Sequence, residues 1–379
     1  IAVSNFDTSA DDNTIDMSLM TGVQEVGLVA SNATGDVVFS NVPNIMTINA
    51  MAGSGDITVT YAAALVAGAA DANTINVSGY TGTISNLAIE AITLNSGAAK
   101  SVIAALTSTQ AKSLTITGDT KLTITGALGA SLKTVDASAT TAGVDLTMAT
   151  TATNIITGGS GDDRVNYDLT LNAAGADLFD GGAGNDTVII DDPADMTPTA
   201  VAGITNVETL EANTLSSSYY DADAIAGITQ VRSSGVSDGI TGAKIRFTDL
   251  PNTVSIQVRG TEGVEGQLAV NGDTDVANVS LATASGLGVI ATTLHLAEFE
   301  TINITTGLTA SATGPVTNSV NSVINVSGVG GLTLGNSSST VLKVVDASGL
   351  VGTVGLTMGT NAAAAVYGGV TITGSGLVD

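Results

Sequence analysis

The chain has no cysteine, no tryptophan and a single histidine, and it has only 10 lysine and arginine residues against 35 acidic ones. Without cysteine it can form no disulfide, no thiolate metal site and no cysteine nucleophile. The net charge of −25 excludes a nucleic-acid-binding surface, which needs clustered Lys and Arg, and disfavours an anionic membrane surface. The longest apolar run, residues 61–70, is too short to span a bilayer.

The hydrophobic residues are mostly small or β-branched, because aromatic residues make up only 3% of a chain that is 44% hydrophobic. Apolar and polar residues alternate in short segments such as 113–117, 121–125 and 301–305. Gly, Asn, Asp or Ser interrupts this pattern about every 8 to 12 residues, as in short strands joined by tight turns. We predict an all-β chain, with one or two helical turns in each of the segments 101–111 and 221–226.

The sequence repeats itself at long range. The phrase LKTVDAS at Leu132–Ser138 returns as LKVVDAS at Leu342–Ser348, and each copy is followed by Leu-Thr-Met, 210 residues apart in both cases. The chain is therefore an imperfect tandem duplication. A solenoid stacks equivalent rungs and reuses the same inward side chains, so the repeats favour a parallel β-solenoid or β-roll. A fold with sandwich-like elaborations is the alternative.

Two nonapeptides stand between the copies, GGSGDDRVN at Gly158–Asn166 and GGAGNDTVI at Gly181–Ile189. A degenerate copy at Asn172–Asp180 keeps one glycine, Asp177 and an apolar residue. The pattern resembles the repeats of the RTX family, which form a parallel β-roll with Ca²⁺ held between successive turns. The resemblance implies an embedded RTX calcium-binding segment.

The residues themselves suit a calcium site. Glycine permits sharp turns with inward carbonyl oxygens, and Asp adds a carboxylate to a set of hard oxygen ligands. Ca²⁺ takes about six to eight oxygens, so two stacked turns must share one ion. The expected ligands are the carbonyls of Gly159, Gly161, Gly182 and Gly184 with the carboxylates of Asp163 and Asp186. A second, weaker site would pair Asp177 with Asp191 or Asp192. The alternative is Gly-Asp hairpin turns without metal.

These features divide the chain into three parts. We expect a first β-solenoid module at 1–154, the RTX segment at 155–192 and a second module at 193–379. Residues 374–379 are similar to the start of another nonapeptide, so the natural chain is expected to continue into a further repeat.

Other polar residues have simpler interpretations. Glu25, Glu90, Glu208 and Glu300 recur beside apolar residues, which predicts that they accept backbone N–H groups at a corner or reach a cation. His295 is interpreted as a strand histidine and not as part of a catalytic triad. Two acidic stretches are interpreted as solvated loops, with further calcium sites as the alternative. They are Asp7, Asp11, Asp12 and Asp16, and Asp273 with Asp275.

The duplication, the low lysine content, the missing cysteine and the calcium nonapeptides together are similar to secreted surface-layer (S-layer) proteins of Gram-negative bacteria. This resemblance implies a non-enzymatic, self-assembling extracellular protein that is exported by type I secretion. Its copies would form a calcium-dependent two-dimensional lattice at the cell surface, with outer-membrane lipopolysaccharide as a further partner through a region outside this sequence.

Two other functions stay open from the sequence. An RTX adhesin or biofilm-matrix protein would share these features but bind a surface or a glycan. A polysaccharide-active β-helix enzyme would carry a groove with clustered Asp, Arg and Lys.

Overall fold

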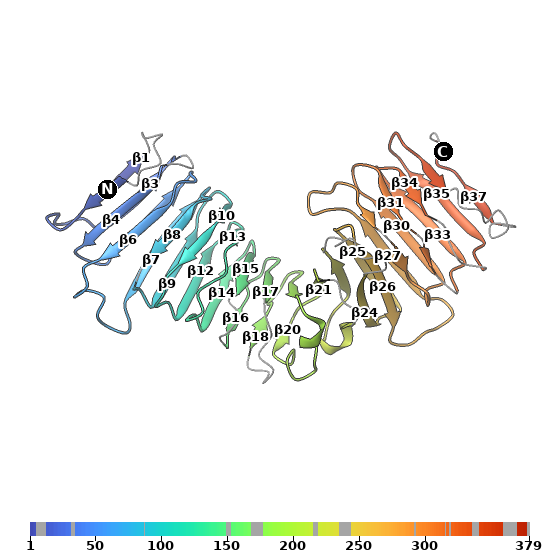
Figure 1. Cartoon of the computed structure of the whole chain (residues 1–379), viewed down its shortest axis with the longest axis horizontal. Coiled ribbons are helices and arrows are strands. Elements are labelled where there is room, and N and C mark those ends of the chain that lie inside the picture. Colours follow the sequence, from blue (N-terminus) through green and yellow to red (C-terminus); the bar gives the residue numbers. More distant parts are fainter. Residues whose placement is uncertain are drawn as a thin grey trace. The chain divides into compact units, whose positions relative to one another are not determined.

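The chain folds as a parallel β-solenoid of about 14 turns, which confirms the predicted fold class (Figure 1). The computed structural model describes the following residues: 1–4, 13–31, 35–86, 88–148, 153–167, 177–214, 219–234, 244–291, 293–314, 316–317, 320–335, 341–358 and 370–376. Contacts divide the chain into a first unit, Ile1–Ile189 with Thr197–Val207, and a second unit, Ile190–Met196 with Glu208–Asp379. Both complete nonapeptides fall in the first unit, and the three-part division at residues 154 and 192 stays a prediction.

The first unit is built from parallel strands that recur once per rung. Its longest sheet has the strand order β1 (Ala2–Ser4), β3 (Glu25–Val29), β5 (Thr47–Met51), β7 (Ala72–Ser78), β9 (Ala91–Ser96), β12 (Ser113–Gly118), β14 (Thr134–Thr140), β16 (Ile155–Thr157), β18 (Leu178–Asp180) and β20 (Ile204–Thr205). A second sheet has the order β11 (Ala105–Thr107), β8 (Thr83–Asn86), β6 (Ile57–Tyr61), β4 (Val37–Val42) and β2 (Asn13–Asp16). Further neighbouring strands are β10 (Ser101–Ile103), β13 (Leu122–Ile124), β15 (Val144–Met148), β17 (Arg164–Tyr167) and β19 (Thr187–Ile190).

The second unit repeats this construction. One row of strands has the order β21 (Thr209–Ala212), β23 (Gln230–Ser233), β25 (Thr253–Val258), β27 (Val276–Leu281), β30 (Thr301–Thr306), β33 (Val323–Gly328), β35 (Val344–Leu350) and β37 (Thr371–Thr373). Another has β22 (Tyr220–Asp221), β24 (Lys244–Leu250), β26 (Gly263–Leu268), β29 (Leu294–His295) and β32 (Val316–Thr317). The smallest sheet has β28 (Ile290–Ala291), β31 (Ser311–Thr313), β34 (Leu332–Leu334) and β36 (Leu356–Met358).

Period-two alternation decides which side chains enter the core. In β30, Ile302 and Ile304 are buried, while Asn303 between them faces outward and is half-buried. The Nδ2 of Asn303 donates to the Oδ1 of Asn278 on one neighbouring strand at 2.8 Å, and its own Oδ1 accepts from Asn325 on the other at 2.8 Å. The rungs therefore stack in register, with apolar ladders inside and amide ladders outside.

The duplication extends to irregular details. The pairing of β12 with β14 shifts register between Thr115 and Thr117, and the pairing of β33 with β35 shifts between Asn325 and Ser327, 210 residues later. Equivalent Asx turns follow, in which Ser138 N donates to Asp136 at 3.0 Å and Ser348 N to Asp346 at 2.9 Å. Two copies that share a bulge and a turn at the same offset have the same rung geometry.

Helical structure is confined to short turns in the described residues. The predicted helical turn at 101–111 is wrong, because β10 and β11 occupy it, and the small residues there alternate in burial as strands do. A 3-10 turn, η2 (Ala222–Ala224), forms in the second predicted segment, with the Asp221 side chain accepting from Asp223 N. No described helix is long and apolar enough to cross a membrane.

The ladder geometry predicts a graded response to substitutions in β30. Ile304→Ala should lower the free energy of unfolding by about 2–5 kcal/mol, because it empties a core position. Asn303→Ala should cost about 1 kcal/mol for each lost amide hydrogen bond. Thr305→Ala, on the same strand and exposed, is the control and should change stability by less than about 0.5 kcal/mol. Urea unfolding followed by circular dichroism measures all three, and a cost at Thr305 equal to that at Asn303 would contradict the amide ladder.

Candidate metal centre

The two complete nonapeptides form stacked corners of the first unit. Residues 158–163 connect β16 to β17, and residues 181–186 connect β18 to β19. The backbone N–H of Ala183 donates to the carbonyl of Gly159 at 3.0 Å, and Thr187 N donates to the carbonyl of Asp163 at 2.8 Å. The predicted stacking of these turns is confirmed.

Glycine is required at the corner positions for two separate structural reasons. Gly182 and Gly184 have φ values of 89° and 141°, in the region that favours glycine. Gly158 and Gly161 are required by close approach instead. A Cβ on Gly158 would collide with the carbonyl oxygen of Gly181, and one on Gly161 with the backbone of Gly143. The paired glycines thus set how closely the corners stack, which adds to the role in turning that the sequence suggested.

Asp163 and Asp186 close these corners with buried carboxylates, 1% and 0% exposed. Asp163 accepts from Gly159 N in its own turn and from Val144 N in the preceding rung, both at 2.7 Å. Asp186 in turn accepts from the backbone N–H of Asp163 at 2.7 Å. Each carboxylate therefore binds the backbone of the rung before it.

Burial governs the electrostatics of the corner. It raises the pKa of Asp163, while the N–H groups of Gly159 and Val144 and the positive charge of Lys121 oppose that rise. Lys121 lies at the surface of the corner, where its Nζ donates to the carbonyl of Asp162 at 3.3 Å. Two buried carboxylates one rung apart repel each other if both are ionised, so a bound cation would stabilise the ionised pair.

The donor set fits Ca²⁺ in its chemistry, since carboxylate and carbonyl oxygens are the ligands this ion prefers. No three His, Cys, Asp or Glu side chains gather as a metal cluster among the described residues. A calcium ion at this corner would therefore take ligands from the carboxylates of Asp163 and Asp186, from backbone carbonyls and from water. The same carboxylates also cap backbone N–H groups, a role that needs no metal.

The second expected calcium site is described only in part. Residues 172–176 lie outside the described residues. Asp177 is 4% exposed and accepts from Asn154 N in the preceding rung at 2.7 Å. In the second unit, Asp192 accepts from Ala194 N at 2.9 Å and begins the 3-10 turn η1 (Pro193–Asp195), and the backbone carbonyl of Asp191 accepts from the Tyr220 hydroxyl at 2.8 Å.

The recurring glutamates confirm the predicted structural role at two positions. Glu90 accepts from Asp71 N at 3.0 Å, and Glu300 accepts from Asp275 N at 2.8 Å, in each case from the neighbouring rung. Glu25 instead accepts from the Asn49 side chain at 3.3 Å. For Glu208, the backbone carbonyl accepts from Gln230 N at 3.0 Å.

One of the two loop interpretations needs correction. Asp275 is 3% exposed and accepts from Gly272 N at 2.6 Å, so it is a buried cap and not part of a solvated loop. Its neighbour Asp273 is exposed as expected. Asp16 is also exposed and accepts from Ser18 N at 2.9 Å, whereas Asp7, Asp11 and Asp12 lie outside the described residues.

The second unit contains an ionic cluster that the sequence analysis did not predict. Arg246, Glu265 and His295 occupy consecutive positions across β24, β26 and β29. Lys244 Nζ lies 3.0 Å from Glu265 Oε2, and the hydroxyl of Tyr219 lies 3.2 Å from Glu265 Oε1. His295 is a half-buried strand residue as predicted, and burial lowers its pKa. Only the rung register brings these distant residues together.

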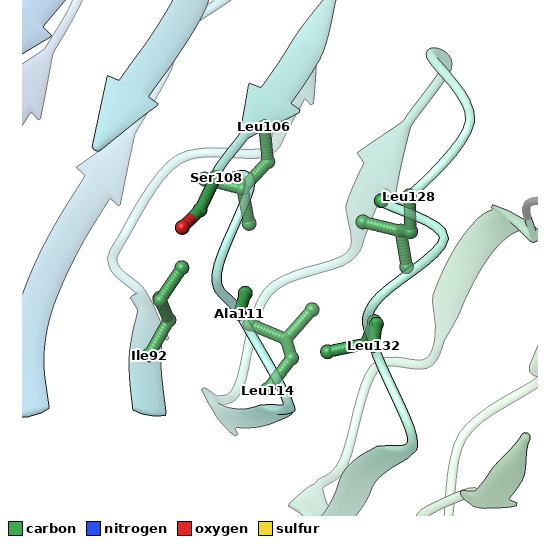
Figure 2. Close-up of a pocket in the computed structure, with 8 residues that line it drawn as sticks. Ile92, Leu106, Ser108, Ala111, Leu114, Leu128 and Leu132 are labelled. Atoms are coloured by element: carbon green, nitrogen blue, oxygen red, sulfur yellow. The ribbon is translucent and has the colours of Figure 1, made fainter. Parts of the chain in front are cut away.

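The first unit also contains a small apolar gap near β11 and β12 (Figure 2). Ile92, Leu106, Leu114, Leu128 and Leu132 point into it, and about 10 Å³ is left in which a water molecule could be centred. This volume admits one water molecule at most, so the gap is a packing defect and not a ligand site.

No known protein-family model matches the chain, and no curated protein matches it.

The corner geometry predicts that two glycines with similar backbone angles respond differently to substitution. Gly22→Ala, at φ 75° with no atom within 4 Å of the added Cβ, should cost about 1–2 kcal/mol for the conformation alone. Gly182→Ala meets the Gly159 carbonyl as well and should cost about 1–3 kcal/mol more. Thermal unfolding compares the two variants, and equal losses would contradict the close stacking of the corners.

Proposed function

We propose that this chain is a structural, self-assembling extracellular protein whose folding depends on Ca²⁺ and whose copies form a surface layer. The observation that carries the proposal is the pair of stacked glycine corners in which Asp163 and Asp186 are almost wholly buried. A ligand set of carboxylates and backbone carbonyls suits a hard divalent cation.

Electrostatics supplies the mechanism. A chain with a net charge of −25 repels itself, and buried carboxylates add to the cost of folding as long as they stay ionised. Where free Ca²⁺ is scarce, as in the cytoplasm, the corner would be less stable and the chain easier to keep unfolded for export. Outside the cell, Ca²⁺ would neutralise the paired carboxylates and link successive rungs.

The remaining parts of the proposal follow from this one. Export by type I secretion, a position on the cell surface and the absence of enzymatic activity belong to the same proposed role. The partners would be other copies of the chain, with lipopolysaccharide bound through a region outside this sequence. A solenoid suits such a role, because its rungs present long lateral faces of repeated composition.

Calcium titration of the metal-depleted chain tests the folding part. After dialysis against EGTA, Ca²⁺ should increase the strand signal in circular dichroism and raise the melting temperature. Asp163→Asn combined with Asp186→Asn should raise the half-saturating Ca²⁺ concentration about tenfold or more, because the site loses both charged ligands. Asp119→Asn removes an exposed corner carboxylate and is the matched control. Identical titrations for the double variant and the control would overturn the assigned site, and an unchanged strand signal on adding Ca²⁺ would overturn calcium-dependent folding.

Electron microscopy tests the assembly part. Ordered sheets of purified protein in Ca²⁺ would support a surface layer. Dispersed monomers that bind a glycan or a surface would support the adhesin alternative instead.

A further inference from the structure

One corner of the second unit carries a row of exposed apolar side chains, one in each of four successive rungs. Leu287, Leu308, Val329 and Val351 follow one another at intervals of 21, 21 and 22 residues, and they are 46%, 63%, 48% and 73% exposed. We call these four residues the apolar row. Their order along the solenoid places large hydrophobic groups at the spacing of the rungs.

Backbone hydrogen bonds show that the row is continuous. Leu308 N donates to the carbonyl of Gly286 at 2.7 Å, and Val351 N donates to the carbonyl of Gly328 at 2.9 Å. Between them, Gly330 N donates to the carbonyl of Gly307 at 2.7 Å. Each member of the row therefore lies on the rung next to the previous one.

The duplication shows that the fold of a rung does not require this row. The positions 210 residues before Leu308, Val329 and Val351 belong to the same corner of the first copy, where Gly118 and Gly328 have matching φ values of 115° and 123°. The position 210 residues before Leu287 is Val77, a buried residue of β7. The equivalents of Leu308, Val329 and Val351 are also exposed, and they are Ala98, Asp119 and Thr141. The first copy builds these three positions with small or polar residues, so the fold of a rung does not require apolar side chains at Leu308, Val329 and Val351.

The distribution of charge indicates what covers the row. Residues 1–300 carry 33 acidic and nine basic residues, a net charge of −24. Residues 301–378 contain only Lys343 and Asp346, which cancel. A cationic partner would be drawn to the acidic part of the chain, and two copies repel each other there. An uncharged apolar surface fits an uncharged apolar surface, and the neutral part of a second copy supplies one.

We propose that the apolar row is a self-association face, which pairs with the same face of a second copy in a two-fold arrangement. Such a contact is self-complementary, so a single row serves both partners. It also brings two strongly acidic molecules together through the region where their repulsion is weakest. The proposal deepens the proposed assembly into a layer and rests on it for its biological role.

Cysteine crosslinking of the 379-residue chain tests the proposal, because these residues include no cysteine and give no background. Val329→Cys places a thiol in the row, and Asp119→Cys places one at the equivalent exposed corner of the first copy. With a short bismaleimide, V329C should form covalent dimers about tenfold faster than D119C, because association raises the effective concentration of the two thiols. Equal rates would overturn the proposal.

A second variant tests the row without a new thiol. L308A/V329D/V351T gives the second copy the residues of the first, and the pair L19A/V270A removes exposed apolar side chains elsewhere as a control. In sedimentation velocity, the control should associate like the unmodified chain, while the triple variant stays monomeric with an unchanged circular dichroism spectrum. Association of the triple variant at the strength of the control would overturn the proposal.

Failure of this inference can be told apart from failure of the proposed function. If the chain forms calcium-dependent sheets but V329C crosslinks no faster than D119C, the surface layer is supported and the self-association face is overturned. If V329C crosslinks faster than D119C but the chain forms no sheets, the self-association face is supported and the surface layer is overturned.

Discussion

The register between successive rungs is the constraint on which the structure depends. Parallel strands bring every residue next to its equivalent one rung earlier, so a side chain that suits one rung must also tolerate its own repetition. Apolar residues satisfy this inside, as Ile302 and Ile324 do in register, and amides satisfy it outside, as Asn303 and Asn325 do. Charged residues satisfy it poorly, since equal charges would lie one rung apart.

Buried carboxylates are placed where the backbone can compensate for them. Asp163, Asp177 and Asp186 each accept a backbone N–H from the preceding rung, and Glu90 does the same. The glycine corners differ because two such carboxylates, those of Asp163 and Asp186, are buried in successive rungs, with the backbone N–H of Asp163 joining them.

Much of this architecture was predictable from the sequence, and the reasons are physical. Alternating Thr, Ile and Val specified strands, and identical phrases 210 residues apart specified stacked rungs. The nonapeptide spacing specified which corners would meet. What failed depended on register between distant segments. Asp275 resembled a loop residue until its rung position made it a cap, and residues 101–111 resembled a helix because short alanine-rich strands lack a clear period of two. The cluster around Glu265 could not be predicted for the same reason, because its members extend from Tyr219 to His295, 76 residues apart.

Four buried carboxylates, those of Glu90, Asp163, Asp177 and Asp186, accept a backbone N–H from the preceding rung, whereas the exposed Asp56 and Asp162 accept one from the following rung. The carboxylate of Asp177 accepts from Asn154 N, and that of Glu300 accepts from Asp275 N, so in each pair the acceptor lies later in the chain than the donor. The N–H groups of such a rung are satisfied only when the following rung has folded against it. Folding that proceeds from the amino end therefore leaves unsatisfied N–H groups on the last folded rung until the following rung adds its carboxylate.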